Sequence, residues 1–164
     1  MNFNKNAKVL FLTGVDQELP QLLQQMTNIN IENMMTLQVY GPEIAQPFGD
    51  LMRAIILAIY QGNVEEVVVV GTTHDQRRDV RAKLYEQDGI PEKAKTVDFL
   101  FTRCMPEFPG VTLDEWLQGS KTVTESVQKS VKLLREHPLL PSGFTVHGLL
   151  MDKEKGELTE VKVS

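Results

Sequence analysis

The stretch Val67-Val68-Val69-Val70-Gly71-Thr72-Thr73-His74-Asp75 places an unbroken run of valines directly before a glycine and a polar turn. Valine favours strands, and an apolar run without polar alternation is typical of a parallel strand that is covered on both faces. In open α/β sheets, ligands bind beyond the carboxyl ends of such strands. The residues that follow the valine run are therefore the first place to look for a functional site.

The surrounding segments predict the rest of an α/β fold. Apolar runs at residues 8–14 and 34–40 predict two more strands, and residues 16–26 and 49–61 have the apolar spacing of helices. The helix at 49–61 is apolar around most of its circumference, so we expect it to be buried on more than one side. This alternation predicts a three-layer α/β/α domain with a mainly parallel, Rossmann-like sheet. Residues 144–163 predict an antiparallel C-terminal edge strand or hairpin.

The segment after the valine strand has weaker patterns. We predict a polar helix, a linker with a glycine and a proline, a fourth strand, a loop, a short helix and a surface helix, at residues 75–87, 89–91, 97–101, 103–110, 112–118 and 122–136 respectively.

Composition excludes several classes of protein. The chain has 164 residues, 41% of them hydrophobic, which suits one domain over residues 1–164. Its formal charge of -5 comes from interspersed acids and bases, so nucleic acid is not an expected partner. No apolar run approaches the roughly 20 residues of a membrane span, and the first residues lack a signal-peptide pattern, so we expect a cytoplasmic protein. The single cysteine, Cys104, excludes an intramolecular disulfide and a Cys-rich zinc site, and we expect a partly buried thiol.

Several motifs resemble those of the β-class carbonic anhydrases, which are zinc enzymes that hydrate carbon dioxide. Residues 126–140 resemble the helix of that family that ends in His-Pro-Leu. Val146-His147-Gly148-Leu149-Leu150-Met151-Asp152 resembles its V-H-G-x-x-x-D strand, and Lys155-Gly156-Glu157-Leu158 resembles its T-G-x-L turn. Residues 47–53 are similar to the short bacterial members. The resemblance spans about residues 7–163, so it implies the fold of that family.

The same resemblance locates the zinc site of the family in this chain. The family uses a C-x-D-x-R motif after its first strand and an H-x-x-C motif after its third. The first motif falls on Gly14, Asp16 and Glu18, and the second on Thr72 and Asp75. All three metal ligands are replaced, and Glu18 stands where the family has arginine. The resemblance therefore implies a vestigial site with no catalytic residue, no zinc and no other cofactor.

Two alternatives remain open at this stage. A divergent zinc-dependent carbonic anhydrase would need substitute ligands, for which His74, Asp75, Asp16 and Cys104 are the candidates. A metal-free small-anion binder would use backbone N–H groups after Thr72, although Asp75 in the same turn opposes an anion. Our preferred hypothesis is a non-catalytic homologue with a binding or regulatory role.

The other polar residues have structural interpretations. We expect Asp16 to cap the helix at 16–26, His137 to cap helix carbonyls, and His147 to be a packed strand residue. The apolar helix at 49–61 and the dimeric packing of the family indicate a homodimer. An unidentified protein partner also remains possible.

Overall fold

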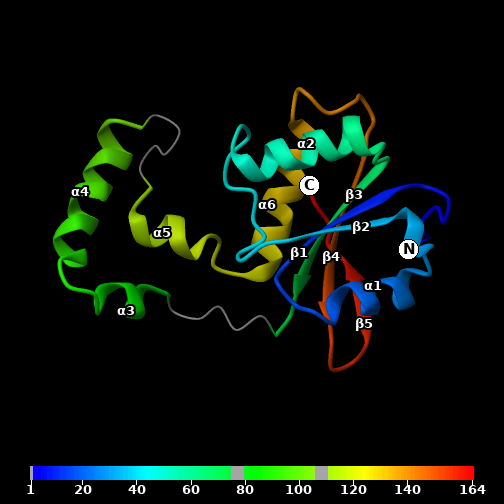
Figure 1. Cartoon of the computed structure of the whole chain (residues 1–164), viewed down its shortest axis with the longest axis horizontal. Helices are drawn as coiled ribbons and strands as arrows, with labels where there is room; N and C mark the ends of the chain where they lie inside the picture. The colour runs from blue at the N-terminus through cyan, green and yellow to red at the C-terminus, as the bar shows by residue number, and fades with distance from the viewer. Residues whose placement is uncertain (1, 75–79, 106–110) are drawn as a thin grey trace. The chain divides into compact units, whose positions relative to one another are not determined.

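The structure of the chain, a computed structural model, describes residues 2–74, 80–105 and 111–164 (Figure 1). It divides into two compact units. The first unit is formed by Met1–Asp75 and Thr122–Ser164 and contains the sheet, and the second is formed by Gln76–Lys121.

The first unit is built on a five-stranded sheet with the order β2-β1-β3-β4-β5. The first four strands in that order run parallel, and β5 pairs antiparallel with β4. The strands are β1 (Val9–Thr13), β2 (Met34–Gln38), β3 (Glu66–Thr72), β4 (Thr145–Asp152) and β5 (Glu157–Glu160). The predicted fold class is confirmed, including the antiparallel strand at the C-terminal edge.

Helices cover both faces of this sheet (Figure 1). On one face, α2 (Asp50–Gly62) and α6 (Val123–Glu136) pack over Val67 and Val69. On the other face, α1 (Leu19–Thr27) packs over Val68 and Val70, and a short 3₁₀ helix, η1 (Ile31–Asn33), leads into β2. Successive valines of β3 therefore enter opposite cores, which explains why the run shows no polar alternation.

Two glycines on neighbouring strands allow α6 to approach the sheet closely. A Cβ atom at Gly71 would collide with Val123 and lie 2.9 Å from Val127. A Cβ atom at Gly148 would lie 2.7 Å from Val127 and 3.0 Å from Val131. The valines of α6 fill the space that larger strand residues would need. Side chains at these two positions would push the helix away from the sheet.

The burial of α2 corrects one prediction. Its fully buried residues form a single stripe of Met52, Ile55 and Ile59, and Tyr60 beside it is 59% exposed. The helix is therefore deeply buried on one side and only partly covered elsewhere. In the described parts of the chain, α2 included, no helix has the length and apolarity to cross a membrane.

The second unit contains α3 (Val80–Tyr85), α4 (Ile90–Arg103) and α5 (Leu113–Gln118). The strand predicted at 97–101 is wrong, because those residues lie inside α4. The residues predicted as a linker begin this helix instead: Gly89 is the N-cap with φ 77°, and Pro91 lies in the first turn, which tolerates proline. Parts of the predicted helix at 75–87 and loop at 103–110 lie outside the described residues.

Candidate functional site

The residues that follow β1 and β3 lie at the edge of the sheet that is formed by the carboxyl ends of its parallel strands. These strands are parallel neighbours with Leu12 opposite Val69. Gly14 directly follows β1 and Thr72 is the last residue of β3, so the two lie at adjacent strand ends. Thr72 is half-buried, and a Cβ atom added at Gly14 would meet nothing within 4 Å. This edge is therefore where the resemblance places the metal site.

Asp16 shapes the turn between β1 and α1. Its Oδ1 accepts a hydrogen bond from the backbone N–H of Glu18 at 2.9 Å, and its backbone oxygen accepts one from Gln38 Nε2 at 2.6 Å. The N-cap of α1 is Glu18, which makes no side-chain capping bond. The expected capping role of Asp16 is thus corrected: its carboxylate holds the turn that precedes the helix.

Lys153, in the turn between β4 and β5, binds both carboxylates of this motif. Its Nζ lies 2.7 Å from Asp16 Oδ2 and 3.0 Å from Glu18 Oε2. The Lys153 ammonium holds the pKa of Asp16 below its ordinary value, although burial acts in the opposite direction. Asp16, and after it Glu18, raise the pKa of Lys153. We call Lys153, Asp16 and Glu18 the lysine cluster.

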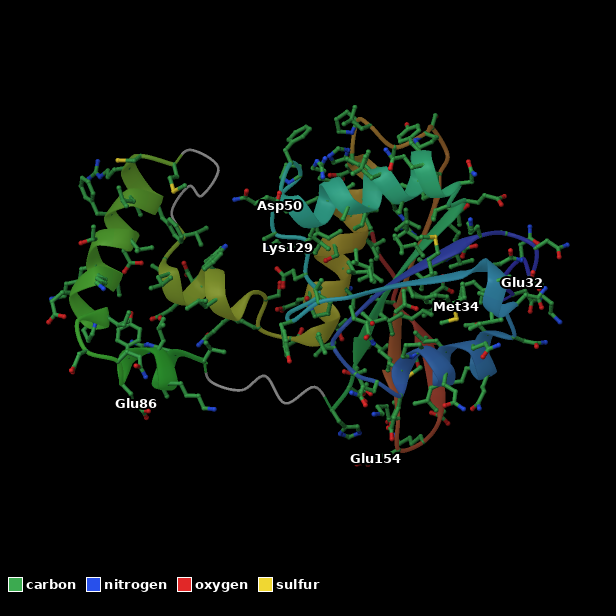
Figure 2. The ribbon with its side chains drawn as sticks, viewed as in Figure 1. Glu32, Met34, Asp50, Glu86, Lys129 and Glu154 are labelled. Carbon is green, nitrogen blue, oxygen red and sulfur yellow. The ribbon has the colours of Figure 1, made fainter. Side chains whose placement is uncertain are left out.

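His74 is directed toward the β4–β5 turn. Its Nε2 lies 3.6 Å from Asp152 Oδ1 and 3.7 Å from Glu154 Oε2, and its side chain is 56% exposed. Glu154 extends from this turn in Figure 2. The N–H of Lys155 donates to the Asp152 carboxylate, which lowers the pKa of Asp152. These long contacts make His74 a surface partner of the turn acids.

The described residues at this edge do not fit a zinc ion. Gly14 has no donor atom, Thr72 offers only a neutral hydroxyl, and Asp75 lies outside the described residues. Cys104 is the C-cap of α4 in the second unit. Its thiol is exposed, so the prediction of partial burial is wrong. Within the described ranges, no group of three or more His, Cys, Asp or Glu could hold a metal.

The two remaining histidines have structural surroundings. His137 is buried, its Nε2 donates to Pro47 O at 2.6 Å, and its Nδ1 accepts from Leu139 N–H at 3.2 Å. It therefore ties a distant loop to the end of α6. As the C-cap of α6, His137 also donates its backbone N–H to Leu134 O at 3.2 Å, so the expected capping of a helix carbonyl is confirmed. His147 lies within β4 with its ring against Phe3, as expected for a packed strand residue.

Known proteins resemble the chain along nearly its whole length. The "Putative carbonic anhydrase-like protein YbcF" of Bacillus subtilis (strain 168) is 44% identical over 157 residues, which cover 96% of this chain and 88% of that protein. A crystal structure of β-carbonic anhydrase isoform I from Trichomonas vaginalis superimposes with a TM-score of 0.69 at 20% identity. That match covers 98% of this chain and 86% of the other.

A second structural match comes from two tetrameric β-carbonic anhydrases of the filamentous ascomycete Sordaria macrospora. It has a TM-score of 0.59 at 17% identity and covers 94% of this chain and 80% of the other. No protein-family model matches the chain. The chain belongs to the β-carbonic anhydrase family, and the family prediction is confirmed.

Lys153 is the main residue of this edge that the sequence analysis missed. It lies 137 positions from Asp16 along the chain, so no local spacing connects the two. One signal was available: Glu18 stands at an arginine position, which leaves Asp16 without its cation. Such a loss predicts a replacement cation from another element, and a lysine beside the V-H-G-x-x-x-D motif was a candidate.

Proposed function

We propose that this β-carbonic anhydrase-like protein does not hydrate carbon dioxide and has a binding or regulatory role. The lysine cluster is the observation that carries the proposal. In the zinc enzymes that the chain resembles, the aspartate at the position of Asp16 pairs with an arginine beside the metal. Here Asp16 is paired with Lys153 from another turn, and Glu18 shares the same ammonium. The pairing supports the proposal that these residues now form a structural ion pair instead of a catalytic site.

The donor atoms at this edge support the same conclusion. A catalytic zinc site needs three protein ligands of nitrogen, sulfur or carboxylate type and one open position for water. Gly14 supplies no ligand, and the Thr72 hydroxyl is a poor one. Without the metal, nothing in this set lowers the pKa of water toward the ~7 that hydration at neutral pH requires.

Metal analysis and hydration kinetics test the proposal together. We expect the purified protein, after incubation with zinc and gel filtration, to carry well under one zinc per chain by mass spectrometry. We expect stopped-flow assays to show no hydration of carbon dioxide above the uncatalysed rate. One zinc per chain together with measurable hydration would show that substitute ligands maintain the enzyme, and would overturn the proposal.

Restoring the family ligands tests the alignment. The triple variant Gly14→Cys, Thr72→His and Asp75→Cys should gain about one zinc per chain, because its side chains recreate a Cys₂His donor set. The open space beside Gly14 gives a new side chain room there. A matched triple variant with Ser, Gln and Ser at the same positions should bind none. If the folded Cys-His-Cys variant does not bind zinc, the assignment of the family's metal-ligand positions to Gly14, Thr72 and Asp75 is contradicted.

We further propose that the protein self-associates as a homodimer. Phe48 is 74% exposed, Tyr60 59% and Leu139 50%, and the Tyr60 hydroxyl donates to Leu139 O at 2.7 Å. Tyr60 lies on α2, Phe48 precedes this helix and Leu139 contacts it, so exposed apolar side chains lie on and next to α2. The related Sordaria macrospora structures are of tetrameric enzymes. Sedimentation velocity should show a dimer that Phe48→Glu weakens at least tenfold. A wild-type monomer at all concentrations would contradict this.

Two sequence expectations remain proposals of the same kind. The first is that residues 1–164 form one family domain, which a single cooperative unfolding transition followed by two probes would support. The second is a cytoplasmic location, which fractionation of expressing cells would check.

A further inference from the structure

A second candidate site lies in the first unit, away from Gly14 and Thr72. A cavity of about 380 Å³ is bounded by Phe3, Met26, Leu149, Gly156, Leu158 and Glu160. Four of these six residues are large and apolar, and they pack with the core beneath α1. The lining thus combines apolar side chains with one carboxylate, and the volume lies in the range of small-molecule pockets.

The polar wall of the cavity continues into a buried group. Glu160 Oε1, at the rim, lies 3.6 Å from His147 Nδ1, and His147 Nε2 lies 3.2 Å from Glu66 Oε1. Glu66 is only 7% exposed, and its burial raises its pKa, although His147 acts in the opposite direction. The ring of His147 also contacts Phe3 at a centroid distance of 6.0 Å. We call His147, Glu66 and Glu160 the histidine cluster.

The histidine cluster has too few hydrogen-bond donors. Two carboxylates with four acceptor oxygens face one imidazole, which carries at most two N–H groups. Among the described residues, neither Glu66 Oε1 nor His147 Nδ1 makes a hydrogen bond. No described lysine or arginine forms an ion pair with Glu66 or Glu160. Glu160 is the member of the histidine cluster that lines the cavity, so a ligand there would donate to the Glu160 carboxylate.

The chemistry of the missing donor can be narrowed. An anion would be repelled by Glu160 and Glu66, and a neutral apolar ligand would give the Glu160 carboxylate no hydrogen bond. A primary ammonium carries three N–H donors and a positive charge, and the face of the Phe3 ring offers it cation–π attraction. The apolar residues would accept the organic part of the same molecule.

We propose that this cavity binds a small organic cation with an apolar body, such as a primary alkyl or aryl-alkyl ammonium. The ammonium lies between Glu160 and the Phe3 ring, and the body contacts Met26, Leu149 and Leu158. His147 and Glu66 lie behind Glu160, and the Glu66 carboxylate adds negative charge there. This site is independent of the vestigial metal edge, so it stands whether or not the protein hydrates carbon dioxide.

The test uses the full chain and three probes of similar shape: 2-phenylethylammonium, 2-phenylethanol and 3-phenylpropionate. Calorimetry should show that the ammonium binds about tenfold or more tightly than the alcohol, as a charge-assisted hydrogen bond of roughly 1.5 kcal/mol would produce, and that the carboxylate does not bind. Methyl NMR should show the largest shifts at Met26, Leu149 and Leu158. Equal binding of ammonium and alcohol would overturn the proposal, as would shifts confined to other methyl groups.

Variants on β5 supply a matched control. Glu160→Gln should weaken binding of 2-phenylethylammonium about tenfold, because it removes the charge at the cavity rim. Glu157→Gln makes the same charge change on the same strand, where alternation directs its side chain to the opposite face. It should change the affinity less than twofold. If both variants lose the same affinity, the effect comes from the overall charge of the protein, and the proposed site is overturned.

Discussion

The lysine cluster and the histidine cluster have the same composition, one basic residue between two carboxylates, but different surroundings. In the lysine cluster, a partly exposed ammonium with three N–H donors reaches both carboxylates at 2.7 and 3.0 Å. In the histidine cluster, one carboxylate is buried and the contacts are 3.2 and 3.6 Å, without hydrogen-bond geometry. Burial and donor number therefore decide whether such a triplet is satisfied.

The pKa values of one carboxyl group in each cluster are shifted in opposite directions. The pKa of Asp16 is lowered, chiefly by its hydrogen bond with Lys153, whereas the pKa of Glu66 is raised, chiefly by burial. The first carboxylate stabilises the fold in its charged form, and the second is destabilised in that form. The two clusters should therefore give opposite dependences of stability on pH.

The largest effect is expected when the histidine cluster loses its base. His147→Leu removes the partner of a buried carboxylate, so we expect the free energy of unfolding at pH 7 to fall by about 2–4 kcal/mol. Urea unfolding followed by circular dichroism measures this. At pH 5 the loss should be smaller, because Glu66 becomes protonated more readily. Lys153→Met, which breaks the more exposed cluster, is the control, and an equal loss in that variant would remove the contrast between the clusters.

The next largest effect concerns the charge of Glu66, which the substitution by glutamine removes while nearly keeping the size of the side chain. The raised pKa of Glu66 means that the folded state binds a proton more readily than the unfolded state, so its charge costs stability as pH rises above about 4.5. Glu66→Gln should remove this decline. The free energy of unfolding of the variant relative to wild type should therefore be higher at pH 8 than at pH 4, by up to about 1 kcal/mol. Unfolding curves across this range measure the difference. A steeper decline in the variant would show that the Glu66 carboxylate is satisfied in its charged form.

The smallest effect concerns the lysine cluster. Lys153→Met should lower stability by about 0.5 kcal/mol at low salt and by less at high salt, because exposed ion pairs are weak and screened. The stability that Asp16 contributes is present above its ordinary pKa of 3.8 and is lost as pH falls through its lowered value. Carboxyl NMR titration should show the pKa of Asp16 rising in Lys153→Met.

Lys155→Met is the matched control for this titration, since Lys155 lies in the same turn but binds Asp152. Its effect on the pKa of Asp16 should be small. Equal shifts in both lysine variants would assign the lowered pKa to the general positive charge of the turn.

The sequence predicted the sheet well, because its signals are local. The valine run, the glycines that end strands and the turn before β5 each specify an element within about ten residues. The edge with Gly14 and Thr72 was also located, through motif spacing. The failure at 97–101 has a local cause: Phe99, Leu100 and Phe101 suggest a strand, but the helix-forming residues from Glu92 to Lys95 begin a helix that continues through them.

Both charged clusters were missed for a different reason. Lys153 meets Asp16 across 137 positions, and His147 meets Glu66 through the pairing of β3 with β4. Such contacts depend on strand order and register, which single-residue patterns do not specify. His147 was correctly expected to pack within a strand, yet its two carboxylate partners became visible only in the structure.

The place of the second unit in the chain has a consequence for chain entropy. Gln76–Lys121 is inserted between β3 and α6, so it lengthens the loop that must close before β3 pairs with β4. Because loop-closure entropy grows only with the logarithm of length, a loop about threefold shorter would save roughly 1 kcal/mol. From this term alone, the sheet should gain about that much stability, and fold somewhat faster, when Gln76–Lys121 is replaced by a short flexible linker.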